Sequence, residues 1–171
     1  MKRKLYILNM LNHKLHDLNN IIKSALIFME YRIKTEHVSL RKKFTPNIPK
    51  VQVNADDIFL VIVNLLTNAF DSMPKGGKLL IESKCYKGRD TCVQFSISDT
   101  GCGIEKNEMD KIFEPFFTMK ADGEGNGNGL GLTICQTIIE NHNGKIKVAS
   151  SLGEGTTFTV CFPARQIIML N

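Results

Sequence analysis

The sequence predicts an α+β fold, a two-layer α/β sandwich of helices and a mainly antiparallel sheet. Segments in which apolar residues recur at helical spacing are interspersed with shorter segments in which apolar and polar residues alternate. Some of these short segments come in pairs separated only by turn-forming residues, which is typical of antiparallel hairpins. The 171 residues are enough for one domain with a sizeable core.

The N-terminal part contains two segments of helical character. Residues 1–14 read as the end of a helix or as a linker, and a second helical pattern runs over residues 17–34. Residues 37–44 are predicted to form a strand. Pro46 and Pro49 then interrupt regular structure.

The middle of the chain holds the longest predicted helix, residues 55–73. Two alternating segments, residues 77–85 and 91–99, are predicted strands joined by a turn at residues 87–90. A short helix is expected at residues 107–113.

The C-terminal part begins with a Gly-rich stretch, residues 118–128, which we expect to be mobile. Residues 129–142 form a predicted helix, because an Asn-Gly pair directly after it is a typical helix stop. Residues 145–151 and 155–162 are predicted strands around a Gly-containing turn. Together these elements support the sandwich.

Composition excludes several classes of protein. The chain is 43% apolar and 23% charged, as in ordinary globular domains. It has no apolar run long enough to span a membrane and no secretion signal, so we expect a segment that is not inserted in a membrane. The net charge is +5, but the basic residues lie in short groups without a nucleic-acid-binding motif. We therefore expect no nucleic-acid partner, and the positive balance suits an anionic substrate.

The cysteines predict free thiols. There are five of them, an odd number, and no two have C-x-x-C spacing. This pattern argues against a disulfide framework and against a zinc site, and favours semi-buried thiols in a reducing cytoplasm.

A polar stripe marks one side of the helix predicted at residues 55–73. Asn64, Asn68 and Asp71 follow one another at i, i+4 and i+7 on an otherwise apolar helix. Buried polar groups need partners, and oxygens in such a row can bind a hard cation such as Mg²⁺. A solvent-exposed polar stripe is the alternative.

Asp99 lies at the end of a predicted strand, in phase with the apolar residues of that strand. A carboxylate on the core side must accept hydrogen bonds, and an amine such as that of adenine would supply one. Gly101 and Gly103 let the backbone turn sharply and approach a flat ligand. An ordinary turn is the alternative.

A Gly-rich loop precedes the helix predicted at residues 129–142. Such a loop at a helix N-terminus can hold phosphate groups with backbone N–H groups and the helix dipole. It lacks the G-K-[ST] of a Walker loop and the βαβ context of a Rossmann loop. A flexible linker is the alternative, and residues 153–158 alone read as a plain hairpin turn.

In this order and at these separations, the motifs resemble the boxes of the catalytic domain of bacterial two-component sensor histidine kinases. The resemblance covers residues 15–163 and implies the Bergerat ATP-binding fold shared with gyrase, Hsp90 and MutL-type ATPases, with three helices on one face of a mixed sheet. It also implies that residues 1–14 are the tail of an upstream dimerisation helix or a linker, and residues 164–171 a C-terminal tail. The matching segments are Asn64–Met73 (N box), Asp99–Gly103, Ile112–Lys120 (F box), Gly127–Leu132 and Gly153–Phe158.

The resemblance implies ATP and Mg²⁺ as ligands and gives roles to particular residues. It makes Asn68 the main Mg²⁺ ligand, places Asn64 near metal and phosphate, and lets Lys120 reach a phosphate. It makes Asp99 the acceptor for the adenine amine and puts Thr157 near the base through a water. The full implied nucleotide-binding set is Asn64, Asn68, Asp71, Asp99, Gly101, Gly103, Ile104, Lys120, Gly127, Gly129, Leu130, Gly131, Leu132 and Thr157.

Asn64 favours phosphoryl transfer over hydrolysis. Hydrolysing relatives carry at this position a Glu that activates water, and an Asn cannot accept a proton at neutral pH. The resemblance therefore implies a protein-histidine kinase. The alternatives are an ATP hydrolase, a serine kinase of the anti-sigma type and a non-catalytic nucleotide-binding module. Residues 60–63 are apolar where many members carry a polar residue that assists transfer, which puts the efficiency of transfer in doubt and leaves ATP binding unaffected.

His16 resembles a phospho-acceptor histidine, but we interpret it differently. Only 48 positions separate His16 from Asn64, too few for the acceptor hairpin and the first elements of the catalytic domain. Asp17 or Asn19 instead fits the N-cap of the first domain helix. We therefore expect ATP binding without autophosphorylation. The implied partners are the parent's dimerisation and phospho-acceptor domain and a response regulator receiver domain. The expected location is cytoplasmic, with a membrane anchor elsewhere in the parent left open.

Overall fold

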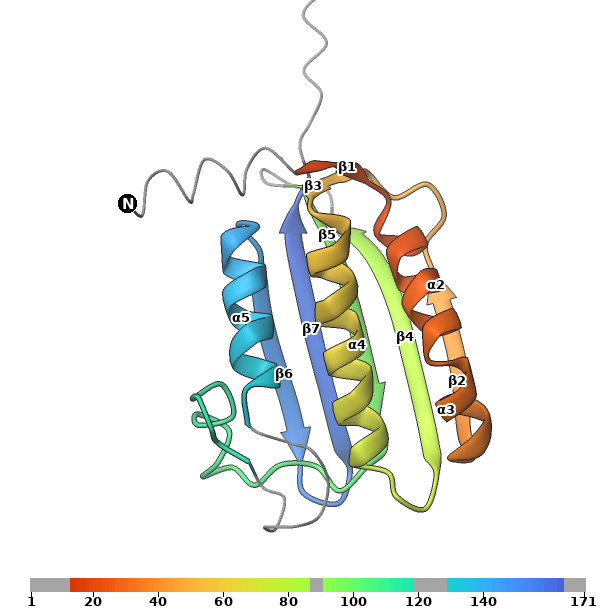
Figure 1. Cartoon of the computed structure of the whole chain (residues 1–171), viewed down its shortest axis with the longest axis vertical. Helices are drawn as coiled ribbons and strands as arrows, with labels where there is room; N and C mark the ends of the chain where they lie inside the picture. The colour runs from red at the N-terminus through yellow and green to blue at the C-terminus, as the bar shows by residue number, and fades with distance from the viewer. Residues whose placement is uncertain (1–12, 87–90, 119–128, 165–171) are drawn as a thin grey trace, which may run out of the picture.

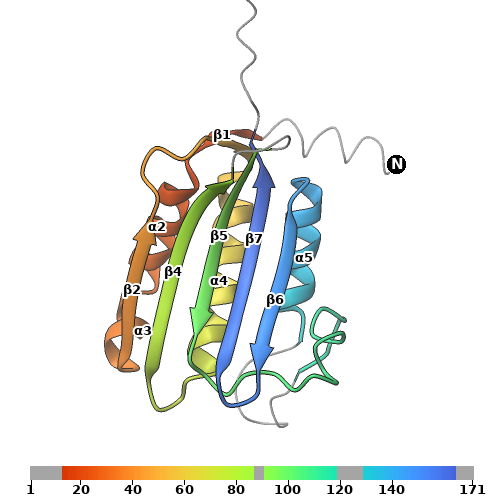
Figure 2. The same ribbon diagram turned by 180° about the vertical axis from the view of Figure 1, so that it is seen from behind.

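The fold is built on a five-stranded sheet with strand order β2-β4-β5-β7-β6 (Figures 1 and 2). The computed structural model describes residues 13–86, 91–118 and 129–164. Strands β2 and β4 are parallel and the other neighbours antiparallel, which confirms the mixed, mainly antiparallel sheet. The strands are β2 (Val38–Phe44), β4 (Gly77–Tyr86), β5 (Cys92–Asp99), β6 (Lys145–Ser151) and β7 (Gly155–Pro163).

The helices cover one face of this sheet, as Figure 1 shows, and the other face carries none in the described part of the chain (Figure 2). The covering helices are α2 (Leu18–Phe28), α4 (Ala55–Asp71) and α5 (Gly131–Asn141), with the short α3 (Glu30–Thr35) following α2. This confirms the predicted two-layer sandwich. None of the described helices has the length and apolar character that a bilayer crossing requires.

The predicted helix at residues 17–34 is divided in two. Met29 departs from helical geometry, with φ −90° and ψ 4°, and separates α2 from α3. Its side chain is buried while that of the neighbouring Phe28 is exposed. The N-terminus agrees with the sequence: the carboxylate of Asp17 accepts a hydrogen bond from the backbone N–H of Asn19 at 2.9 Å and caps α2.

One expectation about local structure is wrong. Residues 107–113 form successive turns rather than a helix, because their backbone bonds, such as that from Lys111 to Glu108, join residues three apart. Lys14, the last residue of the segment expected to be the end of a helix or a linker, lies in strand β1 (Lys14–His16). That strand pairs with β3 (Val51–Val53), and the pair was not foreseen. The rest of the tail, residues 1–12, lies outside the described residues.

His142 joins the end of α5 to the start of α4. Its Nδ1 donates to the carbonyl of Ile138 at 2.7 Å, and its Nε2 accepts from the backbone N–H of Asn54, the N-cap of α4, at 3.1 Å. These two partners require a neutral ring with its proton on Nδ1. The ring is buried and stacks on that of His13 at 4.3 Å between centroids.

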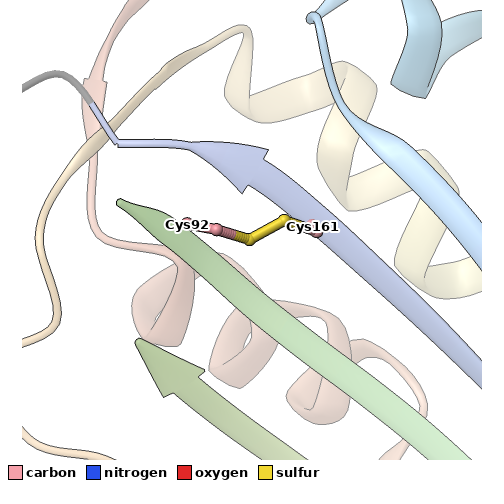
Figure 3. Close-up of a disulfide and its surroundings, with 2 residues drawn as sticks. All are labelled: Cys92 and Cys161. Atoms are coloured by element: carbon pink, nitrogen blue, oxygen red, sulfur yellow. A yellow bond between two sulfur atoms is a disulfide. The ribbon is translucent and has the colours of Figure 1, made fainter. Parts of the chain in front are cut away.

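The structure corrects the expectation of free thiols at two positions. Cys92 in β5 and Cys161 in β7 form a disulfide across neighbouring strands (Figure 3). Both side chains lie on the helix-free face, with Cα atoms 6.2 Å apart, a separation that a disulfide can bridge. The sequence spacing could not reveal this, because 69 positions separate the two residues and strand pairing alone brings them together.

Candidate functional site

Asp99 presents one oxygen of its carboxylate to a ligand. It ends β5 and is only 8% exposed. Its Oδ1 accepts three hydrogen bonds, from the backbone N–H of Gly101 at 2.9 Å, the hydroxyl of Ser72 at 3.1 Å and the backbone N–H of Thr156 at 3.2 Å. All three of these bonds reach Oδ1, and none of them reaches Oδ2. Oδ2 is therefore the atom that remains to accept a donor from outside the protein.

The electrostatics of Asp99 suit a neutral donor. Burial raises the pKa of Asp99 above its ordinary value, and the hydrogen bonds from Gly101, Ser72 and Thr156 oppose that rise. Since Oδ1 is occupied by three donors, a proton added to this carboxyl would bind Oδ2. An amine hydrogen of a base such as adenine fits Oδ2 and the burial around it.

The loop after Asp99 is held against two neighbouring elements. The backbone of Gly101 lies so close to Ser72 that a side chain there would overlap the Ser72 hydroxyl. Gly103 has φ +71°, and a side chain there would overlap the carbonyl of Ser151. The backbone N–H of Ile104 donates to the hydroxyl of Ser150 at 2.9 Å. The predicted residues Gly101, Gly103 and Ile104 are thus brought together beside Asp99.

Thr156, rather than Thr157, stands next to Asp99. Thr157 points to the helix-free face, where its hydroxyl donates to Ser98 at 2.9 Å, so the predicted place of Thr157 near the base does not agree with the structure. Thr156 is buried, and its hydroxyl lies 2.9 Å from that of Ser150. The signal in the sequence was the alternation of β7, which puts Thr156 in phase with the buried Phe158.

The polar stripe of α4 is real. Asn64, Asn68 and Asp71 are all half-buried along this helix. Asn64 Oδ1 lies beside Gly131, 3.6 Å from the point where a Cβ would stand. Burial raises the pKa of the Cys135 thiol to about 12, despite a side-chain hydrogen bond with Asn64, so this bond is made to a neutral thiol. Asn64 therefore faces the beginning of α5.

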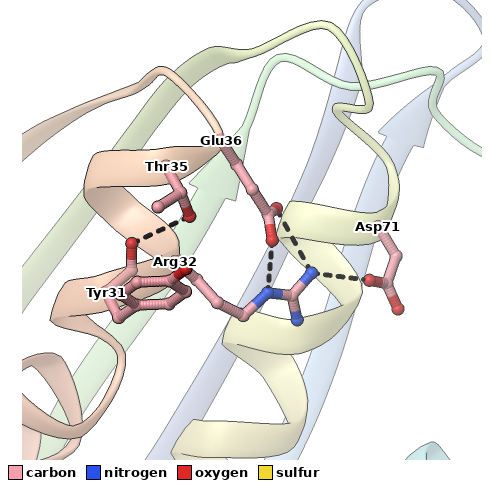
Figure 4. Close-up of polar contacts among 5 residues, drawn as sticks. All are labelled: Tyr31, Arg32, Thr35, Glu36 and Asp71. Atoms are coloured by element: carbon pink, nitrogen blue, oxygen red, sulfur yellow. Dashed lines mark hydrogen bonds and ion pairs between the residues drawn. The ribbon is translucent and has the colours of Figure 1, made fainter.

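Asp71 is held by an arginine that the sequence did not indicate. Arg32 of α3 donates from Nη2 to Asp71 Oδ1 at 3.0 Å and to Glu36 Oε2 at 3.2 Å (Figure 4). Its guanidinium also lies over the ring of Phe70, 5.0 Å from the centroid. Asp71 thus joins the end of α4 to α3. No signal in the sequence connects residues 39 positions apart in this way.

The predicted phosphate loop is described only at its second half. Gly129 has φ +67°, and its carbonyl accepts from the backbone N–H of Phe116 at 3.0 Å. Leu130, the N-cap of α5, has no polar side chain for the first N–H groups of Gly131 and Leu132. Lys120 and Gly127 lie outside the described residues, as does all but residue 118 of the stretch 118–128 that was expected to be mobile.

Helix α4 connects the two ends of the candidate site. At its C-terminus, Ser72 touches Asp99, and two turns earlier Asn64 lies beside the start of α5. A buried acceptor at one end and carboxamides with a helix N-terminus at the other can hold an aromatic base and its phosphate groups, respectively.

Known proteins share this architecture. A family model described as "Histidine kinase-, DNA gyrase B-, and HSP90-like ATPase" matches residues 53–166. The sensor histidine kinase ZraS of Salmonella typhi is 36% identical over 152 residues, which are 88% of this chain and 31% of ZraS. The chain therefore spans less than a third of that relative.

Solved structures agree. The catalytic domain of histidine kinase ThkA matches with a TM-score of 0.77 and 29% identity, over 89% of this chain and 95% of that one. A second structure holds histidine kinase ThkA in complex with response regulator protein TrrA, and matches with a TM-score of 0.73 and 27% identity over 90% of this chain and 42% of that one.

Proposed function

Because the chain belongs to the family of histidine kinase-, DNA gyrase B- and HSP90-like ATPases, we propose that it binds Mg-ATP between α4, the Asp99 loop and the start of α5. It acts as the catalytic domain of a sensor histidine kinase and transfers the γ-phosphoryl group to a histidine outside residues 1–171. The observation that carries the proposal is the buried Asp99 carboxylate, whose Oδ1 accepts three hydrogen bonds from the protein. In the proposal, Oδ2 accepts the adenine amine.

Metal and phosphates bind along the C-terminal half of α4, beside the start of α5. Asn68 is the main Mg²⁺ ligand and Asn64 lies near metal and phosphate, since carboxamide oxygens are hard ligands that Mg²⁺ accepts together with phosphate oxygens. The N–H groups at the start of α5 receive the phosphates. Lys120, Gly127, Gly129, Leu130, Gly131 and Leu132 complete this part of the site. When bound there, Mg²⁺ would supply positive charge against the negative charge of the transferring phosphoryl group.

Asn64 makes transfer to a protein the preferred reaction. A side-chain carboxamide cannot take a proton from water, and this one is bonded to a neutral thiol beside Gly131. The residues orient the nucleotide and exclude water from the base, which are contributions that phosphoryl transfer requires from a protein.

Partners follow from the relatives. We assign residues 1–14 to the tail of an upstream dimerisation helix or linker, residues 15–163 to the catalytic domain and residues 164–171 to a tail. The acceptor histidine lies in the parent's dimerisation domain, and a response regulator receiver domain accepts the phosphoryl group afterwards, in line with the ThkA–TrrA complex. ATP as the phosphoryl donor favours the cytoplasm.

Incubation with γ-labelled ATP and Mg²⁺ tests the proposal. We expect the chain to bind Mg-ATP in calorimetry and to label a separately expressed acceptor hairpin of a related kinase with acid-labile phosphate. It should remain unlabelled itself, including at His16, which lies in strand β1 opposite Val51.

The same assay separates the alternatives. Steady release of inorganic phosphate without labelling would favour a hydrolase. Acid-stable label on a serine would favour a serine kinase. Binding with neither product would leave a nucleotide-binding module. Acid-labile phosphate on His16 would move the acceptor into this chain.

A further inference from the structure

We propose that Ser72 is a positioning residue for nucleotide binding, whose hydroxyl orients Asp99 toward a 6-amino purine. This inference rests on the proposed function. Ser72 is the C-cap of α4, a position where a serine needs no ligand-related explanation. Its contacts nevertheless connect this helix end directly to the carboxylate that receives the base.

Ser72 is bound to the Asp99 loop by side chain and backbone. Its hydroxyl lies 3.1 Å from Asp99 Oδ1 and 2.8 Å from the carbonyl of Ala69. Its own carbonyl accepts from the backbone N–H of Cys102 at 3.1 Å. The hydroxyl has one hydrogen and both neighbours can only accept, so the two share it. Asp99 thus gains a donor from an element other than its own strand and loop.

The third donor decides which oxygen faces the ligand. Gly101 and Thr156 supply backbone N–H groups to Oδ1, and Ser72 supplies the only side-chain donor among the described residues that contact it. With three donors on Oδ1, rotation of the carboxylate would leave donors unpaired, so Oδ2 stays directed away from them. Hydrogen bonds to a charged acceptor are the strong ones, which makes this orientation stiff.

The residue at position 101 is matched to this contact. A side chain on Gly101 would overlap the hydroxyl, the Cβ and the carbonyl of Ser72. Glycine therefore permits the approach of Ser72 to Asp99. Ser72 and Gly101 act as a pair that sets the direction of one carboxylate.

The test compares two nucleotides in calorimetry on the full chain. ATP carries the 6-amino group, and purine riboside triphosphate lacks it while keeping the sugar and phosphates. For Ser72→Ala we expect about fivefold to tenfold weaker ATP binding. The affinity of Ser72→Ala for purine riboside triphosphate should change less than about twofold. This nucleotide has no amino group to donate to Asp99, so the orientation of the carboxylate does not affect its binding. Ser72→Cys keeps a weaker donor of similar size, so its affinity for ATP should lie between those of Ser72→Ala and the native chain.

Controls separate this role from a structural one. Ser24 makes the same kind of bond to its own helix, to the carbonyl of Asn20 at 3.2 Å, but lies far from Asp99 in the sequence and on α2. Ser24→Ala should leave the affinities for both nucleotides unchanged. Equal weakening of both nucleotides by Ser72→Ala would overturn the proposal, because loss of the Ala69 bond alone would do that. No weakening of either would overturn it as well.

Asp99→Asn in parallel tests the premise. If it abolishes the preference for ATP while Ser72→Ala does not reduce it, the adenine assignment stands and the positioning role falls. If Asp99→Asn leaves the preference intact, the adenine assignment itself falls, and with it the role of Ser72.

Discussion

The two ends of the proposed nucleotide site differ in how much of their geometry exists without a ligand. At the base end, Asp99 is buried and fixed by donors from three segments of the chain. At the phosphate end, Asn64 and Asn68 are half-buried on α4. The base end is a prearranged acceptor, whereas the phosphate end supplies ligands to a charge that arrives with the nucleotide.

The two ends therefore contribute differently to nucleotide binding. A preorganised acceptor gives selectivity, because a base that cannot donate leaves a buried carboxylate oxygen unpaired. Carboxamides and helix N–H groups give charge neutralisation, which depends on Mg²⁺ and on the number of phosphates. Substitutions at the two ends should therefore respond differently to changes of base, phosphate and metal.

The largest effect is expected at the base end. Asp99→Asn places a carboxamide where three donors and the adenine amine all need an acceptor, so its NH2 group faces either the adenine amine or the three protein donors and leaves them without an acceptor. ATP affinity should fall about 100-fold. The affinities for ADP and adenosine, measured by calorimetry, should fall by the same factor, because all three ligands share the base.

Asp110→Asn, at an exposed aspartate, is the matched control and should bind normally. Native affinity of Asp99→Asn for ATP would contradict the adenine assignment.

The next effect is expected at the phosphate end. Asn68→Ala removes the proposed Mg²⁺ ligand, so affinity for Mg-ATP should fall about tenfold while affinity for adenosine stays unchanged. Titration of Mg²⁺ at fixed ATP should show that the metal no longer strengthens binding. Asn20→Ala, on the exposed side of α2, is the control. Equal losses for Mg-ATP and adenosine would show that Asn68 supports the fold rather than the metal.

Acidification should weaken the base end selectively. Burial raises the pKa of Asp99, and the ionised form is the acceptor, so binding is complete above that pKa and is lost as the pH falls through it. As the pH falls from neutrality, we expect adenosine affinity to begin to fall at a higher pH than the ordinary pKa of an aspartate would give. Adenosine avoids the titration of the phosphates themselves. Asp99→Asn should give a flat profile, and a native profile that is equally flat would contradict the role of this carboxylate.

The smallest effect separates two adjacent threonines. Thr156→Val removes the hydroxyl bonded to Ser150 beside Asp99 and should weaken ATP binding about threefold. Thr157→Val removes a bond to Ser98 on the helix-free face and should leave ATP affinity unchanged. Each variant serves as the other's control, and a larger loss for Thr157→Val would restore the position that the family resemblance implied.

Regular elements were predictable because their signals are local. The 55–73 helix and the hairpin strands carry clear periodicity, and alternation alone placed Asp99 on the core side of β5. Strands β1 and β3 have three residues each, too few for alternation to show. The turns at residues 107–113 share the composition of a short helix and differ only in their hydrogen bonds.

The missing site residues depend on contacts between distant segments. Ser72 looks like any helix end until the Gly101 loop folds back on it, and Arg32 reaches Asp71 from another helix. The alternation of β7 predicts that Thr156 faces the core, whereas the family resemblance implied that Thr157 lies near the base. Positions within one element follow from periodicity, whereas partners across elements follow from tertiary packing.

The buried imidazole of His142 gives α5 a reporter at the end opposite the phosphates. Its ring exists as one tautomer, bonded to Ile138 and to the N–H of Asn54, so its two nitrogen-15 resonances are distinct and assignable. Helix α5 begins beside Asn64 and ends at this ring. If nucleotide binding slides α5 along α4, the Nε2 resonance moves with it. The motion of the helix can thus be followed by nuclear magnetic resonance without altering any residue of the site.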